Sequence, residues 1–400
     1  MKGGGTLSVD WLQALLATSV QQQCTVAVWR LPEQQNISVL VSFSGVQTVV
    51  DFQKSATLSG FAVTPFYTSG NEIQLVKPDM LFDSNFGDWR IQPHADRNKV
   101  NAFLRLLKKQ LSSSTDNMSW FVHTSANQQY QADKTAYTKL VAKALGKIQQ
   151  KTFDKVVLAR QKIMTLSASV HPADLFSACL KLYRAGMVSL ISAPNLGTWV
   201  GASPERLISR DKQGTIRTTA LAATQPVPEH VSTSARQSWD NINWSHKARK
   251  EQAFVSRFIR DCYQRIGLKN LVEHGPGTVA AYDMLHLQTD FMIEHETTDY
   301  LPFLLLAQLH PTPAVCGMDR TAARQFILAE ERFSRQLYSG YLGPVNLGGE
   351  THLFVNLRCM QFFKQTAALY AGAGITMDSV PEKEWQETEL KMQTLSELLR

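Results

Sequence analysis

The stretch FDKVVLAR, residues 153–160, has the alternation of a β-strand but places a lysine among its hydrophobic residues. With a period of two, Lys155, Val157 and Ala159 share one face, whereas Arg160 falls on the other. One face must therefore accommodate an ammonium group. Either Lys155 is an edge-strand lysine whose charge reaches water, or it belongs to a functional site.

The segments around this stretch predict a dense mixture of helices and strands. Helical spacing of apolar residues covers 134–150, 173–183, 250–267 and 382–399. Strand patterns cover 24–31, 37–43, 187–193, 198–209, 214–223, 351–363 and 367–375, the last two as a hairpin. Because the strands do not alternate regularly with helices, the pattern favours an α+β fold over a series of βαβ units.

Composition and charge are those of an ordinary globular protein. Of the 400 residues 44% are hydrophobic and 19% charged, which is enough to bury a sizeable core. The net charge is +7, but the basic residues are scattered and form no stripe interleaved with aromatic residues. We therefore expect no nucleic-acid partner.

The cysteines and the apolar runs predict a cytoplasmic protein. Five cysteines is an odd number, and they are far apart, so they are expected to be buried thiols in a reducing compartment. The N-terminus has no convincing signal peptide. The longest apolar run, 300–309, is about half of a membrane span, so no membrane partner is expected.

One predicted helix, 250–267, carries a glutamate on the side that should pack. Glu251 lies one turn before Phe254 and Val255, which belong to the apolar stripe. An ordinary explanation is a glutamate in the first helical turn, favoured by the helix dipole or paired with Lys247. The other explanation is a functional carboxylate.

The C-terminal helix raises the same question. Glu384, Glu387 and Lys391 continue a line that ends in leucines, although a Glu387–Lys391 surface pair would explain two of them. Carboxylates on the packed sides of two helices would be unfavourable unless a cation lay between them. Oxygen ligands alone indicate Mg²⁺ rather than zinc.

Two further features could hold an anion. Arg358, in FVNLRCM, alternates with apolar residues and could grip a carboxylate with its guanidinium fork. The glycines of AGAG, residues 371–374, would let backbone N–H groups approach an anion closely, although a plain hairpin end also explains them.

Six motifs together resemble a known family. They are FDKVVLAR (153–160), GASPERL (201–207), HL (286–287), LHPTPAV (309–315), YAGAGI (370–375) and EWQETELK (384–391). They occur in the order typical of chorismate-utilising enzymes, and the chain is most similar to the isochorismate synthases. The resemblance implies one large α/β domain, of the α+β kind, in which two antiparallel sheets pack together with helices outside. Residues 1–130 would be the variable N-terminal half and 131–400 the chorismate-binding region.

The same resemblance implies roles for individual residues. Lys155 would be the general base that activates water, and Glu205 the general acid. Glu251 and Glu387 would hold Mg²⁺, with Glu384 behind them. The substrate-binding positions would be His286, Arg358, Gly372, Ala373, Gly374 and Lys391.

The implied reaction adds water at C2 of chorismate while the C4 hydroxyl leaves, so one group must remove a proton and another must supply one. The absence of a fused carrier or siderophore module favours menaquinone biosynthesis. Isochorismate supply for a siderophore, a salicylate synthase and a catalytically silent binding protein remain alternatives. An amine-forming enzyme is disfavoured, because Lys155 is present and Ala222 stands where a second lysine is common. We expect a monomer without a glutaminase subunit.

The chain departs from the family pattern at a few positions. Ala223 replaces the glycine of the usual LAGT, which adds a methyl group near the substrate ring. Arg332 and Ser334 stand where proline and aspartate are common, and Cys316 replaces a small residue. None of these changes removes a chemical group.

Overall fold

A computed structural model gives the fold of the chain. It describes residues 7–50, 57–70, 72–112, 119–123, 130–131, 133–168, 170–227, 239, 242–281, 284–294, 298 and 300–399.

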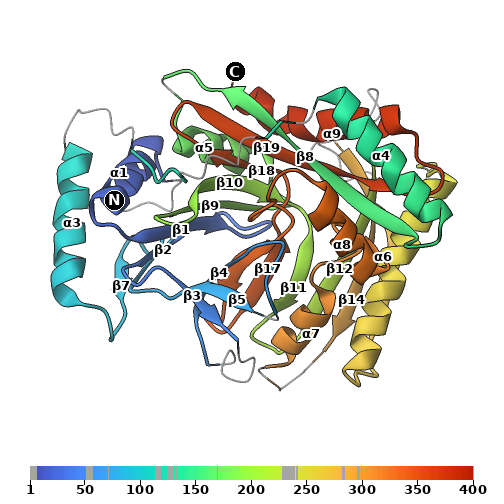
Figure 1. Cartoon of the computed structure of the whole chain (residues 1–400). Coiled ribbons are helices and arrows are strands. Elements are labelled where there is room, and N and C mark those ends of the chain that lie inside the picture. Colours follow the sequence, from blue (N-terminus) through green and yellow to red (C-terminus); the bar gives the residue numbers. More distant parts are fainter. Residues whose placement is uncertain are drawn as a thin grey trace.

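Two antiparallel sheets form the centre of the molecule, and helices lie around them (Figure 1). The ten-stranded sheet has the order β15-β8-β19-β18-β10-β9-β1-β2-β6-β7, and the nine-stranded sheet has the order β13-β14-β12-β11-β17-β16-β4-β5-β3. Large apolar side chains such as Trp29, Phe61 and Phe354 fill the space between the two sheets. The α+β fold with two packed antiparallel sheets is therefore confirmed.

The strands of the ten-stranded sheet are β1 (Thr25–Arg30), β2 (Ser38–Ser42), β6 (Met80–Asp83), β7 (Trp89–Ile91), β8 (Lys155–Thr165), β9 (Met187–Ala193), β10 (Gly197–Ser203), β15 (Gly317–Met318), β18 (Cys359–Phe362) and β19 (Thr366–Ile375). Those of the nine-stranded sheet are β3 (Val46–Val49), β4 (Gly60–Thr64), β5 (Ile73–Val76), β11 (Arg206–Arg210), β12 (Ile216–Pro226), β13 (Val272–Ala281), β14 (Met284–Ile293), β16 (Tyr341–Val345) and β17 (Thr351–Val355).

Helices cover the outer faces of both sheets (Figure 1). On the ten-stranded sheet these are α1 (Val9–Gln21), α3 (Arg97–Ser112), α4 (Lys134–Gln149), α5 (Pro172–Leu182), α9 (Pro381–Ser396) and the short η2 (Glu397–Leu399). On the nine-stranded sheet they are α6 (His246–Arg265) and α7 (Leu301–Leu309), while α8 (Arg320–Glu330) packs beside β8 and β15. The helices predicted over 134–150, 173–183, 250–267 and 382–399 are thus confirmed as α4, α5, α6 and α9.

The N-terminal strands complete both sheets. β1, β2, β6 and β7 extend the ten-stranded sheet, and β3, β4 and β5 extend the other. Every residue of β1 is buried: Val26 and Val28 face the helices, while Ala27 and Trp29 face the second sheet. A strand that is buried on both faces needs apolar residues on both, and the central residues of β1, VAVW, provide them.

The segment predicted as one strand over 198–209 is two strands in different sheets. β10 ends at Ser203 and β11 begins at Arg206, so the chain crosses between the sheets at Pro204 and Glu205. Proline has no N–H to continue the ladder, which is a physical reason for the break at this point.

The segment predicted as one strand over 351–363 also crosses between the sheets. β17 ends at Val355 and β18 begins at Cys359, with Arg358 at φ 46°. The two crossings are hydrogen-bonded: Ala202 N donates to Arg358 O at 3.0 Å, and Val355 N donates to Glu205 O at 3.0 Å. Simple alternation therefore does not decide where Arg358 points, because its backbone is not extended. The tertiary structure brings Glu205 and Arg358 together instead.

The apolar run at 300–309 contains α7, which packs against the nine-stranded sheet with Leu305 and Leu309 fully buried. Among the helices of the described residues, none has the length and apolar composition needed to cross a bilayer. All five cysteines are buried free thiols, as the sequence predicted.

Candidate active site

One cavity collects most of the residues that the sequence singled out. It lies where the two crossing segments meet, and β8, β12, α6, β14, β19 and α9 also contribute to its lining. The predicted site residues that line it are Lys155, Glu205, Glu251, His286, Arg358, Gly372, Gly374, Glu387 and Lys391. Nine residues from distant parts of the chain therefore meet in one place.

Several lining residues were not among the predicted site residues. They are Leu221, Ala314, Val315, Tyr338, Leu357 and Tyr370. Ala314 and Val315 end the LHPTPAV motif and Tyr370 begins YAGAGI, which were usable signals, but the others are apolar or aromatic residues that resemble ordinary core positions. They give the cavity a partly apolar wall against which a carbon ring could pack.

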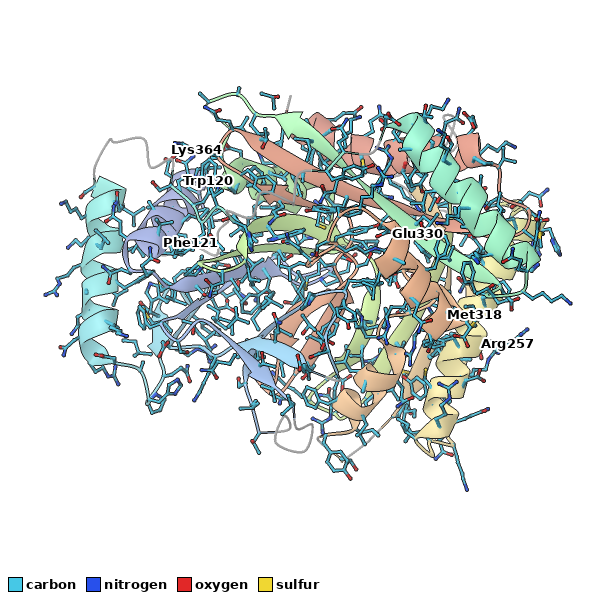
Figure 2. All side chains as sticks on the ribbon, in the orientation of Figure 1. Trp120, Phe121, Arg257, Met318, Glu330 and Lys364 are labelled. Atoms are coloured by element: carbon cyan, nitrogen blue, oxygen red, sulfur yellow. The ribbon has the colours of Figure 1, made fainter. Side chains whose placement is uncertain are left out.

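Lys155 is buried at the start of β8. Its side chain is only 3% exposed, so the alternative of an edge-strand lysine that extends into solvent does not hold. Met318 in β15, labelled in Figure 2, pairs with it on the outer side of the strand. On the other side lies Gly374, where an added Cβ would be 3.0 Å from both Lys155 Cε and Glu251 Oε1. Because Gly374 has no side chain, the side chains of Lys155 and Glu251 have room to face the cavity.

Glu205 lies in the first crossing segment and is 4% exposed. Burial raises the pKa of its carboxyl group to about 8, although the ammonium groups of Lys155 and Lys391 oppose that rise. A carboxyl group with this pKa is mostly protonated at neutral pH. Glu205 can therefore donate a proton to a group in the cavity, as a general acid must.

Glu387 lies on α9 and contacts Lys391, whose Nζ is 2.6 Å from Glu387 Oε1. Burial alone would raise the pKa of Glu387, but Lys391, Lys247 and Lys155 outweigh it and hold the pKa below its ordinary value. The Glu387–Lys391 pair expected as the ordinary explanation does form, yet both members line the cavity. The two explanations therefore coexist.

Lys247 does not pair with Glu251, the partner that helical spacing suggested. Its Nζ is 2.7 Å from Glu384 Oε1 on α9, so its ion pair joins two helices instead of pairing with Glu251. Glu384 is 2% exposed and does not line the cavity. Its Oε2 is buried and has no hydrogen-bond partner in the described part of the chain.

The donor set in the cavity suits a hard cation. Glu251 and Glu387 offer carboxylate oxygens from two helices, and Glu384, one turn before Glu387 on α9, has an Oε2 without a partner among the described residues. No group of three or more His, Cys, Asp or Glu side chains suited to a metal occurs within the ranges that the structure describes. Mg²⁺ needs only one or two protein carboxylates, because it keeps waters and binds anionic substrates. The residues present therefore fit Mg²⁺ and do not form a zinc site.

Several groups at the cavity could hold an anion. Arg358 is oriented by α9, where its Nη1 donates to Thr394 Oγ1 at 3.2 Å and to Lys391 O at 3.4 Å. Lys391 Nζ donates to Gly372 O at 2.9 Å. Ala373 does not line the cavity, because alternation along β19 turns its methyl group into the apolar cluster around Leu158.

His286 faces the cavity in its neutral form. Burial and the cations of Arg358 and Lys391 together lower its pKa to about 4, while the hydrogen bond to a backbone carbonyl opposes the shift. That bond joins His286 Nδ1 and Ala223 O at 3.0 Å. Because a carbonyl can only accept, Nδ1 carries the proton. His286 can therefore orient a substrate by hydrogen bonding but adds no positive charge.

Ala223 occupies a backbone position that favours glycine. Its φ is 60°, and it lies within the register shift between Ala222 and Gln225 where β12 pairs with β14. A bulge residue in the left-handed region is usually glycine, because Cβ clashes there. The chain thus accepts backbone strain at a residue that lines the cavity.

We expect Ala223→Gly to raise the free energy of unfolding by about 1 kcal/mol, because it removes this strain. Ala222→Gly is the matched control, since Ala222 pairs regularly with Leu287 and should lose about 0.5–1 kcal/mol. Urea titration of the two variants measures the difference. Equal destabilisation by both changes would contradict the explanation.

Comparisons with known proteins agree with the geometry of the cavity. The family model described as chorismate binding enzyme matches residues 16–400. The isochorismate synthase MenF of Escherichia coli (strain K12) is 32% identical over 279 residues, which cover 69% of this chain and 63% of MenF. The isochorismate synthase EntC of the same strain is 28% identical over 264 residues, which cover 66% of each chain. The chain thus spans just under two thirds of the length of these relatives.

The structural comparison covers more of both chains. The solved structure of the menaquinone-specific isochorismate synthase MenF from Escherichia coli matches 99% of this chain and 92% of that chain. The TM-score is 0.76 and the sequence identity 25%. The similarity therefore includes the N-terminal strands.

Proposed function

The chain belongs to the chorismate-binding enzymes, and we propose that it is an isochorismate synthase. In the proposed reaction water adds at C2 of chorismate, the C4 hydroxyl leaves, and the ring double bonds shift. The observation that carries the proposal is the meeting of a buried lysine, Lys155, and a buried glutamate with a raised pKa, Glu205, in one cavity with cationic groups. One water molecule is added and one water molecule leaves, so substrate and product are isomers.

Lys155 and Glu205 divide the proton transfers between them. Lys155 would act as the base once its ammonium group has lost its proton, taking a proton from the attacking water as the oxygen–C2 bond forms. Glu205 would give its proton to the C4 oxygen as that bond breaks, so that the leaving group departs as water. They lie at the ends of β8 and β10, strands of one sheet that are separated by β19 and β18. The cavity lies between them and can therefore present a base and an acid to different positions of one ring.

The cationic groups would hold the two carboxylates of chorismate. Arg358 offers a planar fork that suits a carboxylate, and its anchorage to α9 reduces the side-chain freedom that is lost on binding. Lys391 would add a second positive charge, and Gly372 lets the substrate approach the backbone of β19. The apolar wall around Leu221 and Leu357 would exclude water from the ring.

Glu251 and Glu387 would hold Mg²⁺ in this proposal, with waters or substrate oxygens as the remaining ligands. Bound there, the ion would neutralise a substrate carboxylate and fix it in register. Lys391 already neutralises Glu387 in the structure, so the lysine would have to share that carboxylate with the ion.

Menaquinone biosynthesis is the pathway that we propose. Its support is the match to the MenF structure over 99% of this chain, together with the 32% identity to MenF. Relatives such as EntC are nearly as similar in sequence, so supply of isochorismate to another pathway is the competing assignment.

Chromatography of the products after incubation with chorismate and Mg²⁺ tests the proposed function. We expect isochorismate to appear and to reach an equilibrium with chorismate. Release of pyruvate with salicylate would instead assign a salicylate synthase, the alternative that shares the base and the acid. No turnover at all would indicate a binding protein that keeps the fold.

We expect activity to require Mg²⁺, and Glu251→Ala or Glu387→Ala to impair turnover without unfolding the chain. In the wild type, Mg²⁺ should also raise the melting temperature, because it binds the folded state alone. The two variants should lose this shift, whereas Glu273→Ala, in a surface pair with Arg260, should keep it. Full activity in excess chelator would refute the prediction, and zinc should substitute poorly.

A further inference from the structure

The outer edge of β8 is only partly covered by another strand. β15 is two residues long and pairs with Lys155 and Val156, after which Val157 N donates to Cys316 O at 2.8 Å. β19 pairs with the inner side of β8 from Val156 to Thr165. From Val157 onward, the outward backbone groups of a buried strand therefore need partners that β15 does not supply.

An ion pair supplies those partners. Arg335 Nη2 donates to Val157 O at 2.7 Å, and Glu331 Oε1 accepts from Ala159 N at 2.7 Å. The two side chains bond to each other at 2.8 Å between Arg335 Nε and Glu331 Oε2, and at 2.5 Å between Arg335 Nη2 and Glu331 Oε1. One donor and one acceptor thus continue the hydrogen-bond ladder of β8 in place of a strand.

The same pair reaches other walls of the cavity. Arg335 Nη1 donates to Val315 O at 2.8 Å, and its guanidinium lies 4.4 Å from the ring centroid of Phe66. Val157 and Val315 both line the cavity, and Lys155 lies two residues before Val157 on the same face. Arg335 is therefore bonded to the backbone of two lining segments at once.

Burial makes this arrangement costly unless every group is satisfied. Both side chains are 2% exposed, and a buried ion pair seldom stabilises a fold more than apolar residues of the same size would. What apolar residues could not do is hydrogen-bond to Val157 O, Ala159 N and Val315 O. The geometry of these three backbone groups is therefore the property that the pair provides.

We propose that Glu331 and Arg335 are positioning residues, which act as a substitute strand to hold β8, and with it Lys155, at the correct depth in the cavity. This inference rests on the proposed function, because it takes Lys155 as the base. Neither residue touches the cavity, so both act through the backbone of β8 and of the segment that ends at Val315.

Arg335→Lys separates charge from geometry. Lysine keeps the positive charge beside Glu331 but lacks the planar fork that reaches two carbonyls. We expect kcat for isochorismate formation to fall about tenfold to a hundredfold, the scale of a small misplacement of a catalytic group, with KM changed by less than about threefold. Glu331→Gln should act in the same direction.

Glu330→Gln is the matched control. Glu330, labelled in Figure 2, precedes Glu331 in the chain but forms a surface ion pair with Lys143 at 2.6 Å. Its kcat should stay within about twofold of the wild type, because exposed pairs contribute little. An Arg335→Lys enzyme with wild-type kcat, or a Glu330→Gln enzyme impaired as strongly as Glu331→Gln, would overturn the proposal.

Residue-resolved hydrogen exchange tests the proposal on the wild type without any variant or any turnover. The Ala159 amide should exchange as slowly as the Leu158 and Arg160 amides, which alternation directs toward β19. Fast exchange at Ala159 would overturn the substitute strand even if the enzyme makes isochorismate. Slow exchange in a protein without isochorismate synthase activity would leave the strand contact in place and refute the proposed function instead.

Discussion

Lys155→Ala is expected to abolish water addition to chorismate while chorismate still binds. The base accounts for about 10² to 10⁴ in rate. Lys391, the other lysine among the described lining residues, lies on α9 and pairs with Glu387. Arg358 and Lys391 would still hold the substrate carboxylates, so affinity should change little. Separate measurements of turnover and of chorismate binding show whether turnover is lost while affinity is kept.

Lys155→Arg decides whether the role is proton transfer or only positive charge. A guanidinium remains protonated at any working pH and cannot take a proton from water, so this variant should be as inactive as the alanine variant. Lys162→Arg is the control, because Lys162 lies on the same strand but pairs with Glu389 at the surface. An active Lys155→Arg enzyme would remove Lys155 from the mechanism.

Glu205→Gln is expected to lower the rate by about 10² to 10⁴, because glutamine keeps the shape and hydrogen bonding of the side chain but has no acidic proton. The structural reason is the raised pKa of Glu205, about 8, which burial produces against the influence of Lys155 and Lys391. Glu350→Gln, on the far hairpin beside His352, serves as the control. A Glu205→Gln enzyme within about threefold of wild type would mean that another group is the acid.

The pH dependence follows from the direction of that shift. A raised pKa keeps Glu205 protonated up to about pH 8, so the acid form is present below this pH and is lost above it. In the wild type, kcat/KM should therefore fall as the pH rises through about 8. This limb of the profile should disappear in Glu205→Gln. Its persistence in the variant would assign the limb to a different group.

The sequence was sufficient to find the chemical groups of the site but not their surroundings. The motif order singled out Lys155, Glu205, Glu251 and Glu387, and all four line one cavity. It could not show that Lys247 pairs with Glu384, because helical spacing describes neighbours within one helix and this pair joins two. Tyr338 and Leu357 were also missed, since a lining residue of this type has the same sequence pattern as a core residue.

Local patterns in the sequence determined helices α4, α5, α6 and α9, several of the strands and the α+β class, because the periods of 3.6 and 2 are properties of the chain itself. Only the tertiary structure decided that 198–209 and 351–363 each break and pass from one sheet to the other. Continuous alternation cannot reveal such a crossing, since both halves are apolar and extended. The raised pKa of Glu205 and the bonding of Glu331 and Arg335 to β8 were decided in the same way. Burial and hydrogen bonding between distant segments produce both, and neither exists until the two sheets have packed.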